Sequence, residues 1–321
     1  MRLPGSPDGS RHGRRVTARA AVTGRRHVIA ALGIAQILAW GSSYYLLAVL
    51  AGPISSDTGW PYTCVVGGVS LGLLVAGLVS VQVGRRIEAR GGRGVLGASA
   101  VLLAAGLTAM AAAPTLPFYL GAWLLIGAGM GAGLYDAAFA TLGRLYGATA
   151  RRTITALTLW GGFASTVCWP LSAWLLDAVG WRGACLTYAG LHLGVTLPLV
   201  LLATPRQTPA QAAPTAEAGR LASSPRGPTI WLLAAVLTTA AAIAAIWSVH
   251  LITLLETRGL SLAAAVGLGT LVGPAQVGAR VVEMALGGRH HPIWTLGAAA
   301  VLIAAGLVLL WSGTGLVVGA L

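Results

Sequence analysis

Long apolar runs without a charged residue alternate with short polar segments along most of the chain. Each run is long enough for a helix that crosses a bilayer, because about 20 residues span the hydrocarbon core. Turn-forming residues split two of the runs, at 114–117 and at 312–315. The pattern therefore predicts nine complete membrane spans and the start of a tenth at 316–321. The expected spans are 29–50, 62–83, 94–113, 118–141, 153–176, 183–203, 230–254, 262–286 and 293–311.

The composition places these spans in a membrane. Hydrophobic residues make up 56% of the chain, charged residues make up only 9%, and the mean hydropathy is +0.79. An ordinary soluble domain carries about 25% charged residues. We therefore expect an all-α polytopic membrane protein.

All 21 basic residues are arginine, and most of them lie on one side of the expected membrane. Arg182 and Arg258 lie on the opposite side, and Arg280 lies inside the eighth expected span. The positive-inside rule then makes the amino terminus cytoplasmic, in an integral protein of a bacterial inner (plasma) membrane. A net charge of +13 confined in this way indicates orientation and contact with anionic membrane lipid, and no nucleic-acid partner is expected.

The chain divides into four expected segments. Residues 1–27 are rich in Arg, Gly and Ser, which predicts a disordered cytoplasmic tail. Residues 28–203 predict an N-terminal bundle of six helices, and 204–229 predict a cytoplasmic linker rich in Pro, Ala and Ser. Residues 230–321 then form an incomplete C-terminal bundle, with helices seven to nine and the start of the tenth.

The segment at the end of the second expected span is echoed at the end of the eighth. The first reads VGRRIEARGGR at 83–93, and the second reads VGARVVEMALGGR at 277–289. Both follow the order Val-Gly, Arg, Glu, Gly-Gly-Arg, at the same place in two sets of six helices. Parallel repeats of helices are typical of one class of membrane transporter.

The first of these segments resembles the signature loop between helices 2 and 3 of the major facilitator superfamily. That signature has a glycine, an acid four residues later, a second glycine and then a basic residue. Gly84, Glu88, Gly91 and Arg93 match it, with Glu in place of the more usual Asp. The resemblance implies the major facilitator fold, here ending within helix 10. It also implies a charge network that closes the cytoplasmic side and joins Glu88 and Arg93 to Asp136.

Alternatives stay open for the charged residues. The arginines of 85–93 could serve only to orient the helices in the membrane. Asp136, the acid within the fourth span, could instead carry a coupling proton. In the eighth span, Glu283 follows Arg280 by three residues. This pair is either a structural gate that echoes the first loop or, through Gln276 and Arg280, part of an anion site.

Candidate solute-binding residues lie in the helices that line the central cavity of this fold. Gln36, Trp40 and Tyr44 recur at intervals of four in the first span, which places them on one helix face. The polar tips of Trp and Tyr need hydrogen-bond partners away from water, so this face suits a partly polar cavity. Packing against neighbouring helices is the alternative. Tyr135 and Trp247 extend the set from the fourth and seventh spans.

Gln276 and Arg280 lie four residues apart in the eighth span. The monocarboxylate and oxalate/formate branches of the superfamily carry an arginine in helix 8 that engages the substrate carboxylate. The monocarboxylate branch has an aspartate four residues before it, where this chain has Gln276. The resemblance therefore implies a carboxylate site, because a guanidinium suits bidentate binding, and it weakens the case for proton coupling through that acid.

The main hypothesis is a secondary active transporter, a monomer that moves a small organic solute such as a carboxylate by alternating access. A coupling ion is a further candidate partner. Efflux of apolar compounds is one alternative, and a non-transporting membrane sensor or assembly subunit is another. No enzymatic activity, cofactor or metal site is expected, because the sequence has no Ser/His/Asp constellation within membrane reach, no metal-ligand spacing and no phosphate loop.

Overall fold

The computed structural model of the chain describes residues 9–206, 228–286 and 292–311. This described part is built from helices and contains no β-strand. Five of its helical stretches are long and apolar enough to cross a membrane, judged by length and composition. One of these, Leu116–Ala203, is a run of successive helices that covers three of the expected spans. The expected all-α class with apolar helices is confirmed, and the number of spans stays a prediction.

The helices form two groups along the chain. The first group comprises α1 (Gly9–Gly41), α2 (Leu47–Thr58), α3 (Tyr62–Arg90), α4 (Gly92–Ala111), α5 (Leu116–Gly133), α6 (Tyr135–Tyr146), α7 (Ala150–Gly162), α8 (Ala164–Leu191) and α9 (Leu197–Ala203). The second group comprises α10 (Pro228–Thr257), α11 (Leu262–Gly269), α12 (Val272–Leu286) and α13 (Pro292–Trp311). A 3₁₀ turn, η1 (Gly147–Thr149), and a π-helical turn, η2 (His192–Thr196), join helices of the first group.

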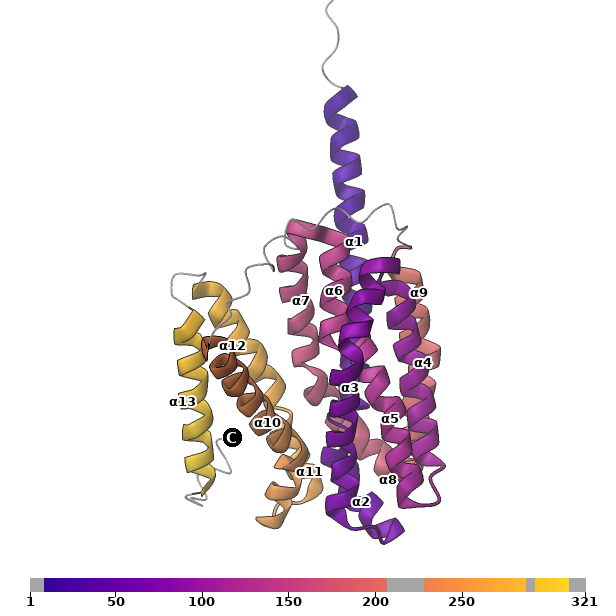
Figure 1. Cartoon of the computed structure of the whole chain (residues 1–321), viewed down its shortest axis with the longest axis vertical. Coiled ribbons are helices and arrows are strands. Elements are labelled where there is room, and N and C mark those ends of the chain that lie inside the picture. Colours follow the sequence, from indigo (N-terminus) through magenta and orange to yellow (C-terminus); the bar gives the residue numbers. More distant parts are fainter. Residues whose placement is uncertain (1–8, 207–227, 287–291, 312–321) are drawn as a thin grey trace, which may run out of the picture.

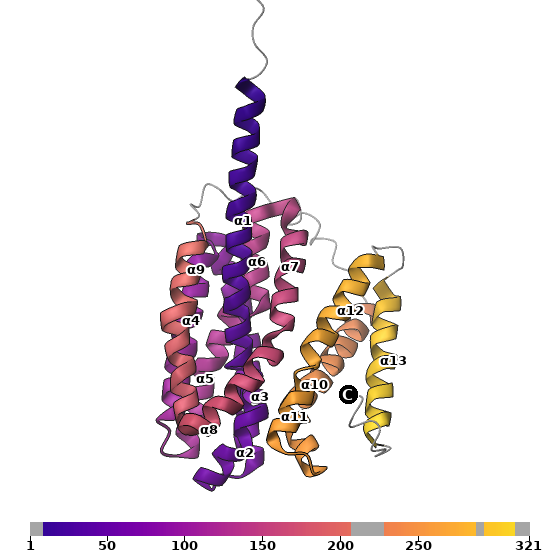
Figure 2. The same cartoon turned by 180° about the vertical axis from the view of Figure 1, so that it is seen from behind.

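The two groups stand side by side, as Figure 1 shows, and Figure 2 gives the opposite view. In the first group α3 and α4 pack along α5, and α1 packs against α7, α8 and α9. The groups touch where α10 meets α2, where α11 meets α8, and where α12 meets α7 and α8. They lie close together at the end that carries α2 and α11, and they diverge towards the end at which α1 projects.

Two expected boundaries differ in the structure. Helix α1 begins at Gly9, so residues 9–27, expected as a disordered tail, are helical. Ala and Arg favour helix, and a helix already nucleated by an adjoining span extends readily. Helix α10 begins at Pro228 and so includes the last residues of the expected linker. The expectations for 1–8, 207–227, 287–291 and 312–321, which include the second break and the tenth span, lie outside the described residues.

An ion pair joins the end of α2 to a turn inside α8. Asp57 accepts a hydrogen bond from Nε1 of Trp181 at 2.9 Å and another from the guanidinium of Arg182. The same guanidinium stacks over the Trp181 ring at 4.2 Å. Gly180 interrupts α8 with a φ of 70°, a left-handed conformation that glycine adopts without a steric penalty. The hydrogen bonds from Trp181 and then Arg182 lower the pKa of Asp57 below its ordinary value.

Acid is expected to loosen this contact. A carboxyl whose pKa is lowered by folding stabilises the folded state above its ordinary pKa of 3.8, and the contribution is lost as the pH falls through the lowered value. Both side chains are about half exposed, so the effect is small. Wild type and Asp57→Asn should differ in melting temperature in detergent micelles at neutral pH, and this difference should shrink when the pH is taken well below the ordinary pKa of 3.8. An unchanged difference at that pH would assign the effect to side-chain shape.

Candidate functional site

The first membrane helix is interrupted between α1 and α2. Residues 42–46 form turns, and the N–H of Tyr45 bonds back to the Trp40 carbonyl at 3.0 Å. The indole N–H of Trp169 donates to the Tyr45 carbonyl at 3.2 Å. This bond satisfies a carbonyl group at the end of a helical segment, where intrahelical partners are missing. Tyr44 and Tyr45 are thereby held at the interruption.

A second interruption separates α5 from α6 at Leu134, whose φ of −73° and ψ of −166° are extended. The buried Gln36 side chain donates from Nε2 to the Gly133 carbonyl at 2.7 Å. Its Oε1 accepts a hydrogen bond from Nε1 of Trp40 at 3.1 Å. Gln36 thus links the interrupted α5–α6 helix to Trp40, and both ends of its amide have protein partners.

Four aromatic rings meet at these interruptions. The Trp40 ring centroid lies 5.3 Å from that of Tyr44 and 5.1 Å from that of Tyr135. Tyr45 joins them, with its ring 5.1 Å from Tyr44 at an interplanar angle of 89°. Such edge-to-face pairs are favourable for ring quadrupoles. The structure therefore brings together the expected residues Trp40, Tyr44 and Tyr135, and adds Tyr45. We call these four residues the aromatic cluster.

Arg280 of α12 reaches the aromatic cluster from the second helix group. Its Nη1 donates to the Thr158 carbonyl in α7, and its guanidinium interacts with the Tyr135 hydroxyl. That hydroxyl also lies 3.5 Å from the same carbonyl oxygen. Arg280 is partly buried, and no acidic side chain in the described part of the chain forms an ion pair with it. A cation without a neutralising acid therefore lies between the two helix groups.

Polar side chains of the second group face the other tyrosines of the cluster. Gln276, one helical turn before Arg280, interacts with the Tyr45 hydroxyl. Ser248 of α10 interacts with the Tyr44 hydroxyl. The three tyrosine hydroxyls of the cluster thus each face a polar side chain from the second group. A solute inserted here could exchange hydrogen bonds with both groups at once.

Two glycines let α12 approach α7 and α8 closely. A Cβ on Gly162 would lie 2.7 Å from Cγ2 of Val277 and 3.0 Å from Nη1 of Arg280. A Cβ on Gly273 would lie 2.1 Å from Oγ1 of Thr166. Small residues allow this approach of two backbones in a membrane. The position of the guanidinium beside α7 therefore depends on a close helix contact as well as on the reach of its side chain.

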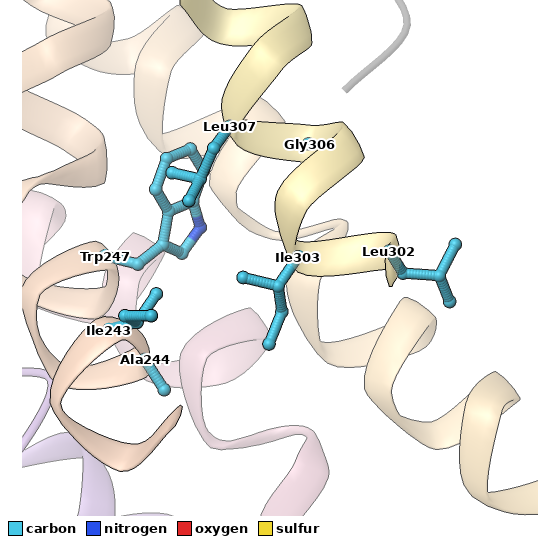
Figure 3. A pocket seen from close by; sticks show the side chains of 7 residues that line it. All are labelled: Ile243, Ala244, Trp247, Leu302, Ile303, Gly306 and Leu307. Carbon is cyan, nitrogen blue, oxygen red and sulfur yellow. The ribbon is translucent and has the colours of Figure 1, made fainter. Parts of the chain in front are cut away.

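Trp247, expected at the same site, faces a different part of the molecule. It lines a cavity of ≈ 290 Å³ between α10 and α13, together with Ile303 and Leu307 (Figure 3). No ring contact joins it to the aromatic cluster within the described residues. The next residue, Ser248, faces Tyr44 instead, and consecutive helical residues point about 100° apart. The rotation of α10 therefore turns Trp247 towards α13.

The signature segment covers the end of α3, the start of α4 and the single residue between these helices, Gly91. Gly91 has φ 82° and ψ 162°, and its N–H bonds to the Ile87 carbonyl at 2.8 Å. Glycine adopts this backbone conformation far more readily than any other residue. Gly84, by contrast, lies inside α3, and a Cβ added there would have no atom within 4 Å. The geometry thus explains the second glycine of the motif, and the first has no steric requirement in this structure.

The expected charge network is not formed in this structure. Glu88 and Asp136 are exposed, Arg93 is partly exposed, and within the described ranges none of them belongs to an ion pair. Asp136 lies in the first turn of α6, where a carboxylate stabilises the free N–H groups of the helix. Glu283 lines a cavity beside α13 and does not pair with Arg280. A gating role for these residues stays a prediction.

His192 is a buried polar residue that the sequence pattern did not single out. Its Nε2 lies 2.7 Å from Oγ of Ser42, at the interruption between α1 and α2, and both side chains are fully buried. Its Nδ1 has no hydrogen-bond partner among the described residues. The residue begins the π-helical turn η2, and such turns frequently accompany functional sites. A lone histidine in an otherwise apolar span was the signal available in the sequence.

Ser42→Ala is expected to lower the free energy of unfolding by about 1–3 kcal/mol, because it leaves the buried His192 ring without its partner. The measurement is reversible unfolding in detergent micelles. Ser56→Ala is the matched control, since that exposed hydroxyl bonds only to the nearby Pro53 carbonyl at 3.1 Å. The control should change the free energy by less than about 0.5 kcal/mol. Equal effects of the two substitutions would contradict a structural role for the Ser42–His192 contact.

Comparison with known proteins finds one matching family model and a solved structure of similar fold. A family model described as Major Facilitator Superfamily matches residues 21–321. The crystal structure of a D-xylose-proton symporter is similar with a TM-score of 0.65 and 14% sequence identity, over 92% of this chain and 76% of that chain. At this identity the likeness shows the fold alone. Sequence comparison with curated proteins finds no match.

Proposed function

The chain belongs to the Major Facilitator Superfamily, and we propose that it carries a small organic carboxylate across the membrane by alternating access. Transport across a membrane follows from the family, and the carboxylate rests on one observation. Arg280, without an acidic partner in the described part, lies between the two helix groups beside a cluster of aromatic rings. The single positive charge at this place favours a solute with a single negative group.

The chemistry of the guanidinium supports this choice of solute. Ionisable side chains inside a membrane are costly, and they mark substrate or ion pathways when they face the interior of a helix bundle. A guanidinium presents two parallel N–H donors to a carboxylate, and such charge-assisted bonds are about twice as strong as neutral ones. One donor already engages the Thr158 carbonyl. This contact orients the fork while other N–H groups stay available for a solute.

The aromatic cluster suits the organic part of the solute. Its rings give an apolar surface, while the hydroxyls of Tyr44 and Tyr45 and the amide of Gln276 provide hydrogen bonds. The same features favour a second candidate, an uncharged polyhydroxy solute, as in the sugar symporter of similar fold. Efflux of apolar compounds would also use the rings. These rivals differ from the carboxylate in one respect, because they do not require the charge of Arg280.

Alternating access is supported by the unequal contacts at the two ends of the helix groups. At the close end, the Tyr62 hydroxyl lies 3.2 Å from Oγ1 of Thr253, and the Tyr62 ring lies 6.1 Å from the His250 ring. The signature loop lies at the diverging end. We propose that Glu88 and Asp136 enter a charge network with neighbouring arginines only when that end closes, which agrees with their exposure here.

The remaining parts of the proposal concern orientation and assembly. The arginine distribution supports a cytoplasmic amino terminus, so the diverging end would face the cytoplasm of a bacterial cell. We propose a monomer as the transporting unit, with a coupling ion as a possible second cargo. Asp136, the acid in the first turn of α6, and Glu283, the acid of the second echoed segment, would be the first residues to substitute in a search for that coupling.

Solute exchange by the purified chain in proteoliposomes tests the proposal. The solutes are a series of short labelled carboxylates, the matching uncharged amides, and D-xylose, each loaded inside and diluted outside. We expect exchange of at least one carboxylate well above protein-free vesicles, and no exchange of its amide. Equal exchange of acid and amide, or exchange of D-xylose alone, would contradict a carboxylate site. Absence of all exchange together with a stably co-purified protein would favour the sensor or assembly alternative.

A further inference from the structure

A groove opens on the outside of the first helix group, near the joint between α3 and α4. Its volume is ≈ 440 Å³, and α3, α4 and α5 line it. Arg86 and Arg90 of α3 stand at the end near the joint, together with Gln82. The walls beyond them are apolar, with Val79 on α3 and Leu102 on α4. The groove is therefore amphipathic along its length, cationic at the membrane surface and apolar towards the membrane interior.

Small side chains create the groove. Helices α3 and α4 each pack along α5, but they make only slight contact with each other. Between them Ala98, Ala128 and Ala132 contribute small side chains to the lining of the groove. Gly94 also lines the groove, and the space beside its Cα is open. The opening thus follows from the packing of α3 and α4 on a common neighbour with small residues between them.

The two arginines have no anionic partner in the described structure. Arg86 and Arg90 are exposed and form no ion pair with any described residue. They are four residues apart on one helix, so they are neighbours on one face, and like charges at this spacing repel each other. Glu88 is two residues from each and therefore does not share that face. An external anion held between the guanidinium groups would remove the repulsion.

We propose that this groove binds an anionic membrane phospholipid, with its phosphodiester between Arg86 and Arg90 and one acyl chain along the apolar wall. Guanidinium groups bind phosphate oxygens with paired, charge-assisted hydrogen bonds. Basic pockets between membrane helices at the cytoplasmic side are suited to anionic head groups. The apolar wall selects a lipid over a free phosphate ion, because the ion has no part that would cover Val79 and Leu102. The site is separate from Arg280 and does not depend on the identity of the solute.

Lipid retention by the purified chain tests this inference. The chain is reconstituted in phosphatidylcholine nanodiscs that contain a minor fraction of phosphatidylglycerol, extracted in mild detergent, and examined by native mass spectrometry. Wild type should retain one phosphatidylglycerol molecule. Arg86→Gln with Arg90→Gln should lower this retention roughly 30-fold, from about fivefold per arginine near the surface. Arg151→Gln with Arg152→Gln removes the same charge from exposed residues outside the groove, and it should change retention less than about twofold.

A second variant tests the acyl part of the site with both arginines in place. Ala98 is exposed, so Ala98→Trp fills the groove without entering the protein core. It should lower retention of phosphatidylglycerol about tenfold and leave the melting temperature of the chain in lipid-free detergent unchanged. Glycerol 3-phosphate in excess is the probe for a free phosphate site, and it should not displace the lipid. Full displacement by this probe, normal retention in Ala98→Trp, or equal losses in the two double arginine variants would each overturn the inference.

Discussion

Arg280→Gln is expected to lower carboxylate transport about 30-fold or more while the chain still folds. Removing one partner of a buried charged contact costs about 2–5 kcal/mol, and each 1.4 kcal/mol corresponds to a factor of about ten. Glutamine removes the charge, but its side chain ends two bonds short of Nη1, so the hydrogen bond to the Thr158 carbonyl is also expected to weaken. The measurement is initial-rate exchange in proteoliposomes, with the melting temperature as a check on folding.

Three matched measurements separate substrate binding from a structural role of Arg280. Arg280→Lys keeps the charge but loses the planar fork, so its activity should fall between wild type and the glutamine variant. Arg151→Gln removes an exposed arginine at the start of α7, about two helical turns before Thr158, and should leave exchange unchanged. Tyr135→Phe removes the hydroxyl that faces the guanidinium and should cause a smaller loss. If Arg280→Gln slows the carboxylate and an uncharged solute equally, Arg280 supports the helix contact and does not recognise the anion.

Gly127→Ala is expected to lower the free energy of unfolding by about 2–3 kcal/mol, the largest loss of stability among these variants. A Cβ on Gly127 would lie 2.5 Å from the Gly72 carbonyl oxygen and 2.9 Å from its Cα, so the neighbouring atoms belong to the backbone of α3. A backbone cannot rotate away as a side chain does, and α3 and α5 would have to separate. Thermal or denaturant unfolding in detergent micelles measures the effect.

Gly121→Ala on the same helix gives a control with the opposite sign. No atom lies within 4 Å of a Cβ at Gly121, so alanine adds no clash there. Alanine also favours helix over glycine by up to about 1 kcal/mol, so this variant should be as stable as wild type or more stable. Two variants with equal stability would show that the α3–α5 crossing can relax, and the close approach at Gly127 would then not be required for the fold.

The membrane class and the family could be predicted because they depend on local properties of the chain. Apolar runs of sufficient length specify membrane helices whatever their neighbours are. Pro114 lies between α4 and α5, and Pro117 lies in the first turn of α5. The spacing of the signature loop agreed with the family whose model matches 21–321. The monocarboxylate or oxalate/formate branch stays a prediction, because it depends on what one arginine binds.

The candidate site was only partly predictable, because side-chain direction depends on how each helix is rotated. The intervals of four in the first span placed Trp40 and Tyr44 on one face, and their rings do meet Tyr135. Trp247 was expected only because the seventh span lines the cavity of this fold, and α10 turns its ring towards α13. Tyr45 was not selected, since it joins the cluster only through the interruption of the helix at 42–46.

Local patterns of residues were enough to identify a helical membrane protein of a transporter family, with a charged residue pair in an otherwise apolar helix. They could not decide which side of that helix each charge occupies. The tertiary structure places Arg280 against α7 and leaves Glu283 beside α13. The physical reason is the close contact of α12 with α7 and α8 at Gly162 and Gly273, which sets the rotation of α12. Hydrophobicity is carried by each residue alone, whereas that rotation exists only once two helices are packed.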